Sequence, residues 1–274
     1  MFLIRWVLPG FALLLLASCS GKNGLQPVLT GPVHTIELAS LEVDSILMIR
    51  QLNPVFMIMG SSGMLLDNIV VAQNSASYER EAGQVHDACT QLFRQTLKQE
   101  VASMGYTLHA SGRKYWDYFK PSQQALRHRT DGILRIRFKQ VGFVSSGLES
   151  DYIPSAYVSA ELIQPDTREV LYRDRFAIGM DDSVVKMASV LEGKINQLTL
   201  SGPGVSYASV KELLAHPQES RDALARLTVA AARHVAMGLR GKRGVPQLLA
   251  YEPAVIDQAP AMPSFNVMRE KMRR

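Results

Sequence analysis

Cysteine is scarce in this sequence of 274 residues, which contains only Cys19 and Cys89. If Cys19 is modified, Cys89 has no intramolecular partner, and this excludes a framework of disulfides. Charged residues make up 20% of the chain and hydrophobic residues 47%, so the composition is that of a globular protein and excludes disorder throughout. The net charge of +5 is not arranged as a basic stripe interleaved with aromatic residues, and no nucleic-acid partner is predicted.

Recognisable motifs for catalysis and metal binding are also missing. His86 and Cys89 are three residues apart, but two ligands make a poor metal site, and the other histidines lack ligand spacing. The Gly60–Gly63 segment lacks the Lys-Ser/Thr of a phosphate-binding loop and is not a Gly-x-Ser-x-Gly motif. Asp181 and Asp182 stand where a helix is expected to begin, and there they complement the helix dipole. The sequence therefore identifies no catalytic residue, metal or cofactor, which favours a non-enzymatic role without deciding it.

The amino terminus has the organisation of an export signal. Arg5 precedes an apolar stretch over residues 6–16, which is shorter than the roughly 20 apolar residues of a transmembrane helix. The stretch ends in four residues that resemble a bacterial lipobox, Leu16-Ala17-Ser18-Cys19. The resemblance implies that residues 1–18 are a cleaved signal peptide and that the Cys19 thiol receives diacylglycerol.

The lipobox resemblance also implies a location. Acylation of the Cys19 amino group, for example by palmitate, would give three acyl chains, and several chains anchor a protein stably where one does not. Ser20 stands where an aspartate retains many such lipoproteins at the inner membrane. By that analogy, the periplasmic face of the outer membrane is favoured over the inner membrane.

Behind the leader, composition divides the chain into three parts. Residues 19–32 are rich in glycine and proline and are predicted to form a flexible tether. Residues 33–240 are predicted to form a single α/β (α+β) domain, with a small mixed or antiparallel sheet packed by helices and a helical C-terminal part. Residues 241–274 contain several prolines, end in basic residues and are predicted to be a disordered tail.

Hydrophobic periodicity predicts the elements of the domain. Strands are expected over residues 33–38, 55–59, 106–109, 134–139, 156–163 and 169–178. Helices are expected over residues 64–82, 84–104, 184–198 and 217–239, with a short additional helix after the capping-box sequence at 209–212. The Gly60–Gly63 segment is expected to be a turn between a strand and a helix.

Three segments within the domain allow a functional and a structural interpretation. Residues 64–82 begin with an apolar run that includes Asp67 and Asn68, which favours a helix packed on the body or on a partner over a membrane span. The aromatic cluster at 115–119 is predicted to cover one end of the sheet, with sugar or partner binding as the alternative. The third segment is a basic sheet face predicted to be solvated and paired with Glu161, Glu169 and Asp174, with anion binding as the alternative: Arg135, Arg137, Lys139, Arg173 and Arg175.

The order of these elements carries a second resemblance. Its residues are Met104-Gly105-Tyr106 at a helix end, Thr130-Asp131-Gly132-Ile133-Leu134 before a basic strand, and Pro165-Asp166-Thr167-Arg168 in a hairpin turn. They resemble periplasm-facing bacterial lipoproteins of the group that contains the curli-secretion lipoprotein and the activator lipoproteins of penicillin-binding proteins. Arg168 stands where that group often has glycine. The resemblance covers residues 50–178 and implies a small α/β domain that docks proteins in envelope assemblies.

Taken together, these features predict a lipid-anchored envelope protein that acts as a periplasm-facing binding or scaffolding module. Its expected partners are the membrane, through the lipid, and another periplasmic or outer-membrane protein, and the sequence is compatible with a homo-oligomer. Two alternatives stay open. One is an envelope hydrolase or glycan-binding enzyme that uses residues 115–119, and the other is an oligomeric secretion or pore subunit in which residues 64–82 enter the membrane.

The lipobox interpretation predicts the behaviour of one variant. Cys19→Ala should abolish metabolic labelling with a radioactive fatty acid and leave the unprocessed precursor, because the acyl acceptor is gone. Electrophoresis of labelled cells measures both effects. Cys89→Ala is the matched control and should be labelled like the unmodified chain; a Cys19→Ala chain that still carries label would contradict the interpretation.

Overall fold

The computed structural model describes residues 35–43, 47–52, 59–120, 122, 130–199 and 204–240. The predicted signal peptide, tether and C-terminal tail lie outside these residues, as do residues 55–58 of one predicted strand. Of the helices that the structure describes, none combines the length and the apolarity needed to cross a bilayer.

The described strands form one mixed sheet in the order β4-β1-β5-β6-β7-β8, with β2 and β3 also paired to β5. The antiparallel centre consists of three long strands, β5 (Gly132–Ser145), β6 (Ile153–Ile163) and β7 (Val170–Ile178). All other pairings are parallel and involve short strands: β1 (Thr35–Leu38), β2 (Glu42–Val43), β3 (Met48–Gln51), β4 (Thr107–Ala110) and β8 (Asn196–Leu198).

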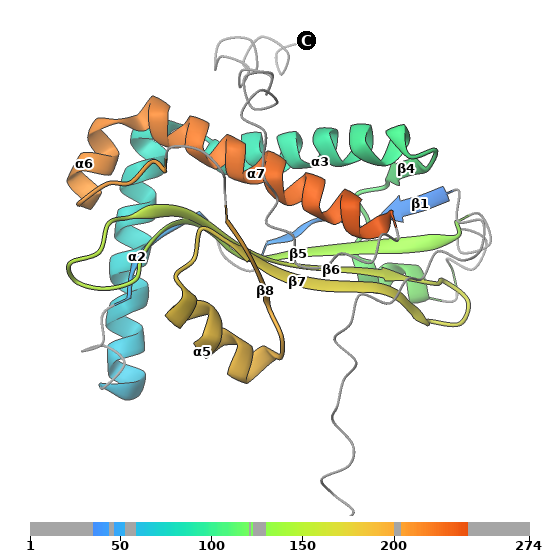
Figure 1. Ribbon diagram of the computed structural model, residues 1–274, viewed down its shortest axis with the longest axis horizontal. Coiled ribbons are helices and arrows are strands. Elements are labelled where there is room, and N and C mark those ends of the chain that lie inside the picture. The colour runs from blue at the N-terminus through green and yellow to red at the C-terminus, as the bar shows by residue number, and fades with distance from the viewer. Residues whose placement is uncertain are drawn as a thin grey trace, which may run out of the picture.

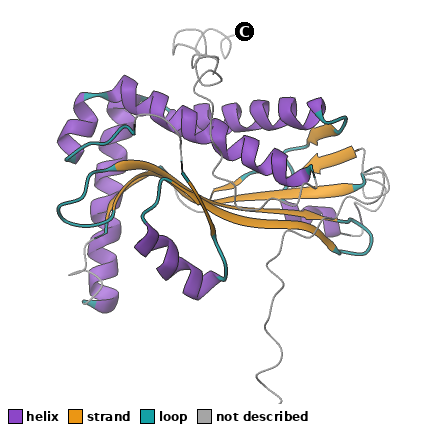
Figure 2. Cartoon of the chain, viewed as in Figure 1, coloured by secondary structure: helices purple, strands orange, loops and turns teal. Residues whose placement is uncertain are grey.

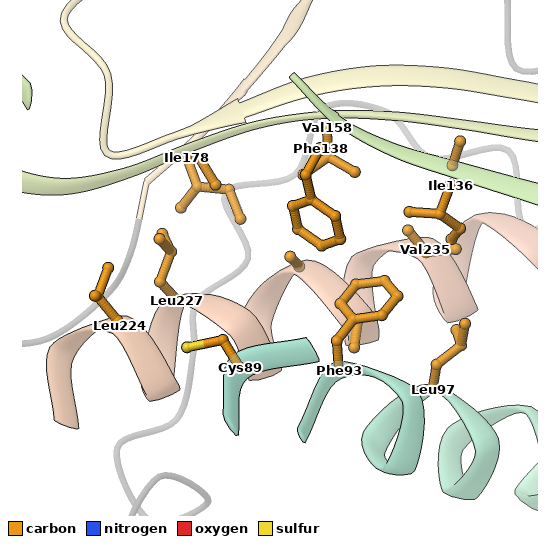
Figure 3. Close-up of a cluster of buried hydrophobic side chains, with 14 of the residues drawn as sticks. Cys89, Phe93, Leu97, Ile136, Phe138, Val158, Ile178, Leu224, Leu227 and Val235 are labelled. Carbon is orange, nitrogen blue, oxygen red and sulfur yellow. The ribbon is translucent and has the colours of Figure 1, made fainter. Parts of the chain in front are cut away.

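Two long helices, α3 (Val85–Ser103) and α7 (Pro217–Leu239), cover one face of the sheet (Figures 1 and 2). Alternation along the strands sends the apolar side chains of β5 and β6 toward these helices, where Phe93 and Phe138 meet edge to face with ring centroids 5.0 Å apart. Figure 3 shows how α3, α7 and the sheet contribute to this core, with Cys89, Phe93, Leu97, Ile136, Phe138, Val158, Ile178, Leu224, Leu227 and Val235 labelled.

On the opposite face of the sheet, the described helices cover the two ends. The 3-10 helix η1 (Tyr115–Phe119) packs on Ile133 and Ile163 at one end. At the other end, α5 (Asp182–Glu192) packs on Tyr157 and Ala177. A strip of strand residues between η1 and α5 therefore carries none of the described helices.

A third helix, α2 (Gly60–Ala82), stands beside the sheet rather than on either face (Figure 1). It covers β3, where the Ser75 hydroxyl accepts a hydrogen bond from the Ile49 N–H at 3.2 Å. Covering the outer side of a short edge strand removes a template for unwanted strand pairing. A short helix, α6 (Val210–Ala215), links the sheet to α7 and contacts α2.

The predicted fold class, a mixed sheet packed by helices with a helical C-terminal part, is confirmed. Helix 84–104 and helix 217–239 occur where the periodicity placed them, as α3 and α7. The Ser209 cap expected from the capping-box spacing is present at α6, because its hydroxyl accepts from the Glu212 N–H at 3.2 Å, and the Glu212 carboxylate accepts from the N–H of Ala208, one residue before the cap, at 2.7 Å.

Two predictions at element boundaries are wrong. Residues 60–63 do not form a turn before the helix, because they are the first turn of α2. The predicted helix 184–198 starts at Asp182 and ends at Glu192, where Gly193 takes a φ of +85°. Residues Asn196–Leu198 then form β8 on the edge of β7. Pairing with β7 gives their backbone N–H and C=O groups the hydrogen-bond partners that a further helical turn would have given them.

Gly142 lets β3 approach β5 closely, and this makes a testable prediction. A Cβ on Gly142 would lie 2.0 Å from the Met48 carbonyl oxygen, and the residue has a φ of +145°. Gly142→Ala should therefore lower the free energy of unfolding by at least ~2 kcal/mol. Gly147→Ala is the control, because its Cβ would come no closer than 3.4 Å to Ser150. Urea unfolding followed by circular dichroism compares the two; equal midpoints would contradict the prediction.

Candidate functional site

The N-terminal half of α2 exposes a set of large apolar side chains. The exposed fraction is 66% for Leu65 and 54% for Ile69, where a helix that packs on its own domain would bury such residues. We call the whole set the apolar face of α2: Met59, Met64, Leu65, Leu66, Ile69 and Val70. Figure 1 shows this half of the helix extending past the sheet on the side of α5.

The side of α2 that contacts the body has the opposite character. Its buried positions include Gly63, Asp67, Ser75 and Tyr78, which lie four, eight and three residues apart and so share one side of the helix. Gly63 and Asp67 are small or polar, so the ion pair of Asp67 with Arg50, rather than large apolar side chains, attaches the N-terminal half to the body. The polarity of the N-terminal half is therefore inverted, with its apolar side chains in water.

Three polar contacts hold α2 in this orientation. Asp67 is buried and forms an ion pair with Arg50 of β3, with 2.5 Å between the carboxylate and the guanidinium. Ser75 accepts the hydrogen bond from β3, and the Tyr78 hydroxyl lies 2.8 Å from the Ser220 hydroxyl of α7. Burial raises the pKa of Tyr78 above its usual value, so this phenol stays neutral at physiological pH.

The apolar face has the geometry of a helical recognition surface. Leu65 and Ile69, and likewise Leu66 and Val70, are four residues apart and lie one above the other. Residues 59–70 extend along about 16 Å of helix axis, at 1.5 Å per residue. Six large side chains exposed this far leave on the order of several hundred Å² of apolar surface in water, a size that marks interaction sites on soluble proteins.

The loop between β5 and β6 adds an exposed apolar side chain at the same end of the sheet. The Gln51 side chain, at the end of β3, donates hydrogen bonds to the carbonyl oxygens of Gly147 and Leu148 at 3.1 and 3.2 Å. These bonds fix the loop next to the strand that carries α2, and the Leu148 side chain is exposed. Leu148 is therefore an exposed apolar side chain on a loop held next to the end of β3.

The aromatic cluster at 115–119 forms η1 and covers one end of the sheet, as predicted. Tyr115 and Tyr118 are buried on Ile133 and Ile163, and Tyr115 contacts Arg135 with the guanidinium carbon 4.7 Å from the ring centroid. Trp116 differs from its neighbours, because 65% of its surface is exposed.

The basic sheet face is paired in part as predicted. Arg173 contacts Glu161 at 2.8 Å, across neighbouring strands. Asp174 was predicted to pair on this face, and that is wrong, because the alternation of β7 turns it toward α7. There Asp174 is buried and lies 2.7 Å from both the His234 ring and the Asn196 amide.

Cys19 lies outside the described residues, whereas Cys89 is a core residue of α3 (Figure 3). Its thiol packs among apolar side chains, and burial raises the pKa of Cys89 to about 11. Across the part of the chain that the structure describes, no group of three or more His, Cys, Asp or Glu residues is placed to hold a metal ion.

The outward orientation of the apolar run at 64–70 was not predicted by sequence reasoning, which placed it on the body or on a partner. A signal for it is present in the sequence. Gly63, Asp67 and Ser75 share the helix side that includes Val71, Tyr78 and Ala82, and this side becomes more apolar toward the C-terminus. If the helix side with small and polar residues is taken as the side that contacts the body, the sequence predicts that Leu65 and Leu66 are exposed.

No family model matches the chain, and no curated protein matches its sequence. Solved structures with partial similarity include the PelC dodecamer from Paraburkholderia phytofirmans, at 9% identity, a TM-score of 0.34, and coverage of 76% of this chain and 88% of that chain. Protein XCC0632 from Xanthomonas campestris has 9% identity, a TM-score of 0.35 and coverages of 76% and 86%. Lipoprotein GNA1162 from Neisseria meningitidis has 13% identity, a TM-score of 0.27 and coverages of 58% and 96%. With these values, the similarities assign neither a family nor a function to the chain.

The environment of Cys89 predicts its reactivity. At pH 8 a thiol with a pKa of about 11 is only about 0.1% thiolate, and the thiolate is the reactive form. With Cys19 acylated as the lipobox resemblance implies, the folded protein should therefore react negligibly with Ellman's reagent over minutes, and the same protein in guanidinium chloride should release one equivalent of thionitrobenzoate. Cys89→Ser is the control and should release none in either state. Rapid reaction of the folded chain would contradict the prediction.

Proposed function

We propose that this chain is a lipid-anchored module of the bacterial cell envelope that faces the periplasm and docks another envelope protein through the apolar face of α2. The observation that supports the docking function is the orientation of α2, with its apolar residues in water and its small and polar residues on the body. Apolar surface of this size in water is unfavourable, and burial of each large aliphatic side chain contributes about 1.5–3 kcal/mol. A partner that covers the face recovers this free energy.

The chemistry of α2 favours a protein partner over the lipid surface. Helices that lie in a membrane interface combine an apolar face with lysine, arginine and aromatic residues at its borders. Between residues 59 and 78 the only charged residue is Asp67, which is buried and paired with Arg50, and the only aromatic residue is Tyr78, which is buried as well. A neutral face of leucine, isoleucine, valine and methionine instead suits an apolar groove or helix pair of another protein.

The spacing on the apolar face supports docking in a groove. Side chains four residues apart form ridges that fit between the ridges of a neighbouring helix. Leu65 with Ile69, and Leu66 with Val70, make two such ridges side by side. A helix that binds in a groove uses anchor residues with this periodicity, which is the recognition mode that the face fits.

The predicted lipid anchor would bring the face close to membrane-associated partners. Fifteen residues separate Cys19 from Thr35, the first described residue, and the connection spans at most about 55 Å when fully extended. A module confined to a layer of this thickness encounters membrane-bound partners at a raised effective concentration, so that a modest apolar contact is sufficient for association.

A photo-crosslinking experiment in cells tests the docking surface. A photoreactive amino acid at the exposed position Ser62, on the same helix side as Leu65 and Ile69, should capture one other envelope protein. Leu65→Asp combined with Ile69→Asp should reduce that capture at least tenfold, because two carboxylates would then have to be desolvated in the contact. Mass spectrometry of the crosslinked species measures both the identity and the yield.

A matched variant controls for the loss of an exposed apolar residue elsewhere. Val190→Asp changes a side chain that is 85% exposed on α5 and should leave the capture unchanged. Because the substituted residues are exposed, all variants should keep their unfolding midpoints. The proposal is contradicted if the double variant captures the same protein in the same yield, or if the crosslinks form only to lipid or to a second copy of this chain.

A further inference from the structure

The strip of sheet that carries none of the described helices lies between η1 and α5. Along β6, the side chains on this face are Tyr157, Ser159, Glu161 and Ile163, in alternation with core residues. Ile163 is covered by η1 and Tyr157 by α5. Ser159 and Glu161 lie between the two covered ends, so the strip crosses the sheet at these two positions.

Strand register places arginines on both sides of these two residues. In the first row, Glu161 pairs with Arg135 on β5 and with Arg173 on β7. In the second row, Ser159 pairs with Arg137 on β5 and with Arg175 on β7. We call these four basic residues, together with Ser159 and Glu161, the arginine strip.

The two rows differ in how their charges are satisfied. Glu161 forms an ion pair with Arg173. Glu42 of β2 contacts Arg135 at 2.7 Å and Arg137 at 3.3 Å. The second row has a hydroxyl at its centre, where the first row has a carboxylate. The guanidinium of Arg175 donates a hydrogen bond to the Glu192 carbonyl oxygen, and it also attracts the Glu192 carboxylate, which forms an ion pair with Lys139. Among the described residues in and next to these rows, the cationic side chains still outnumber the carboxylates.

An exposed aromatic ring borders the strip. The Trp116 ring centroid lies 5.2 Å from the guanidinium carbon of Arg135, and its edge meets Tyr115 with centroids 4.9 Å apart. Tyr115 is buried, whereas Trp116 keeps 65% of its surface in water although a tryptophan gains more than any other residue from burial. Arg135 connects this ring to Arg137, two residues further along β5 and about 7 Å away.

We propose that the arginine strip and Trp116 form a binding site for an acidic glycan. A sugar carboxylate accepts hydrogen bonds from Arg137, Arg175 and the Ser159 hydroxyl in the second row, and a neighbouring sugar ring stacks its C–H face on Trp116. Charge-assisted hydrogen bonds from guanidinium groups supply the preference for an acidic sugar. Arg135, which contacts the Trp116 ring, is about 7 Å from Arg137 along β5, so one short acidic oligosaccharide is able to reach both subsites. This site shares no residue with the apolar face of α2 and does not depend on the docking proposal.

Tryptophan fluorescence provides the test, because the sequence has only two tryptophans, Trp6 and Trp116. In the full-length chain in detergent, Trp6→Phe leaves Trp116 as the only tryptophan. Titration with a galacturonic acid trisaccharide should change its emission saturably, and the affinity should fall as salt is raised. The neutral trisaccharide maltotriose should cause no such change. An equal response to both sugars would overturn the proposal.

Variants of the second row separate binding from folding. Arg137→Gln combined with Arg175→Gln should weaken binding of the acidic trisaccharide at least tenfold, while Arg175→Lys, which keeps the charge, should retain part of the affinity. Lys211→Gln removes one charge from an exposed position on α6 and should bind like the unmodified chain. Unchanged affinity in the double arginine variant would overturn the proposal.

Arg175 also contacts α5, so the double variant is paired with one that cannot disturb the sheet. Trp116→Ala changes an exposed side chain and should leave the unfolding midpoint close to that of the unmodified protein. Isothermal titration calorimetry should show at least tenfold weaker binding of the acidic trisaccharide to this variant. Full affinity in Trp116→Ala would overturn the stacking contact and with it the proposed site.

Discussion

The strand β5 is the constraint on which the rest of the structure depends. One of its edges pairs in succession with β1, β2 and β3, and the other pairs with β6 along most of its length. Its alternation directs one set of side chains into the core beneath α3 and α7 and the other set onto the opposite face. Because β3 attaches to its far end, β5 also determines where α2 stands, and both proposed sites therefore depend on the pairing of this strand.

The N-terminal half of α2 is attached through a polar contact, whereas the C-terminal half also packs apolar surface, with Tyr78 and Ala82 in the main core. A partly buried ion pair such as Arg50 with Asp67 contributes little net stability, because the cost of removing the charges from water offsets their attraction. What it provides is orientation, since only one rotation of the helix about its axis brings Asp67 and Ser75 to β3. An apolar attachment would have buried Leu65 and Ile69, and the chain would have lost its apolar face.

The two proposed sites divide the surface by chemistry. The apolar face of α2 carries no unpaired charge and suits a protein partner, whereas the arginine strip is charged, bordered by Trp116 and suited to an acidic glycan. They lie on different elements, one beside the sheet and the other on its open face (Figure 1). A module with the proposed lipid anchor and these two proposed surfaces would be able to hold a protein and a polymer of the envelope at the same time.

Sequence patterns were reliable where neighbouring residues decide the structure. The alternation at 134–139, the apolar stripe of α3 and the capping box at Ser209 each result from contacts within one turn or one strand pair, and the structure confirms them. The prediction failed after Gly193, where apolar spacing continues but β7 offers an edge for pairing. The hairpin turn at Arg168 also depends on the strands around it. Arg168 adopts a left-handed backbone conformation there, with a φ of 61°, although glycine is the residue that favours this conformation.

The sequence by itself determined the periodic elements, the scarcity of cysteine and the resemblance of the leader to a lipobox, because these depend on residue type and on local spacing. The tertiary structure decided which side of α2 faces water and which arginines stand around Ser159. Both depend on strand register and on contacts between residues far apart in the chain, such as Arg50 with Asp67 and Tyr78 with Ser220. The free energy of such contacts is set by the three-dimensional arrangement, and no local pattern encodes it.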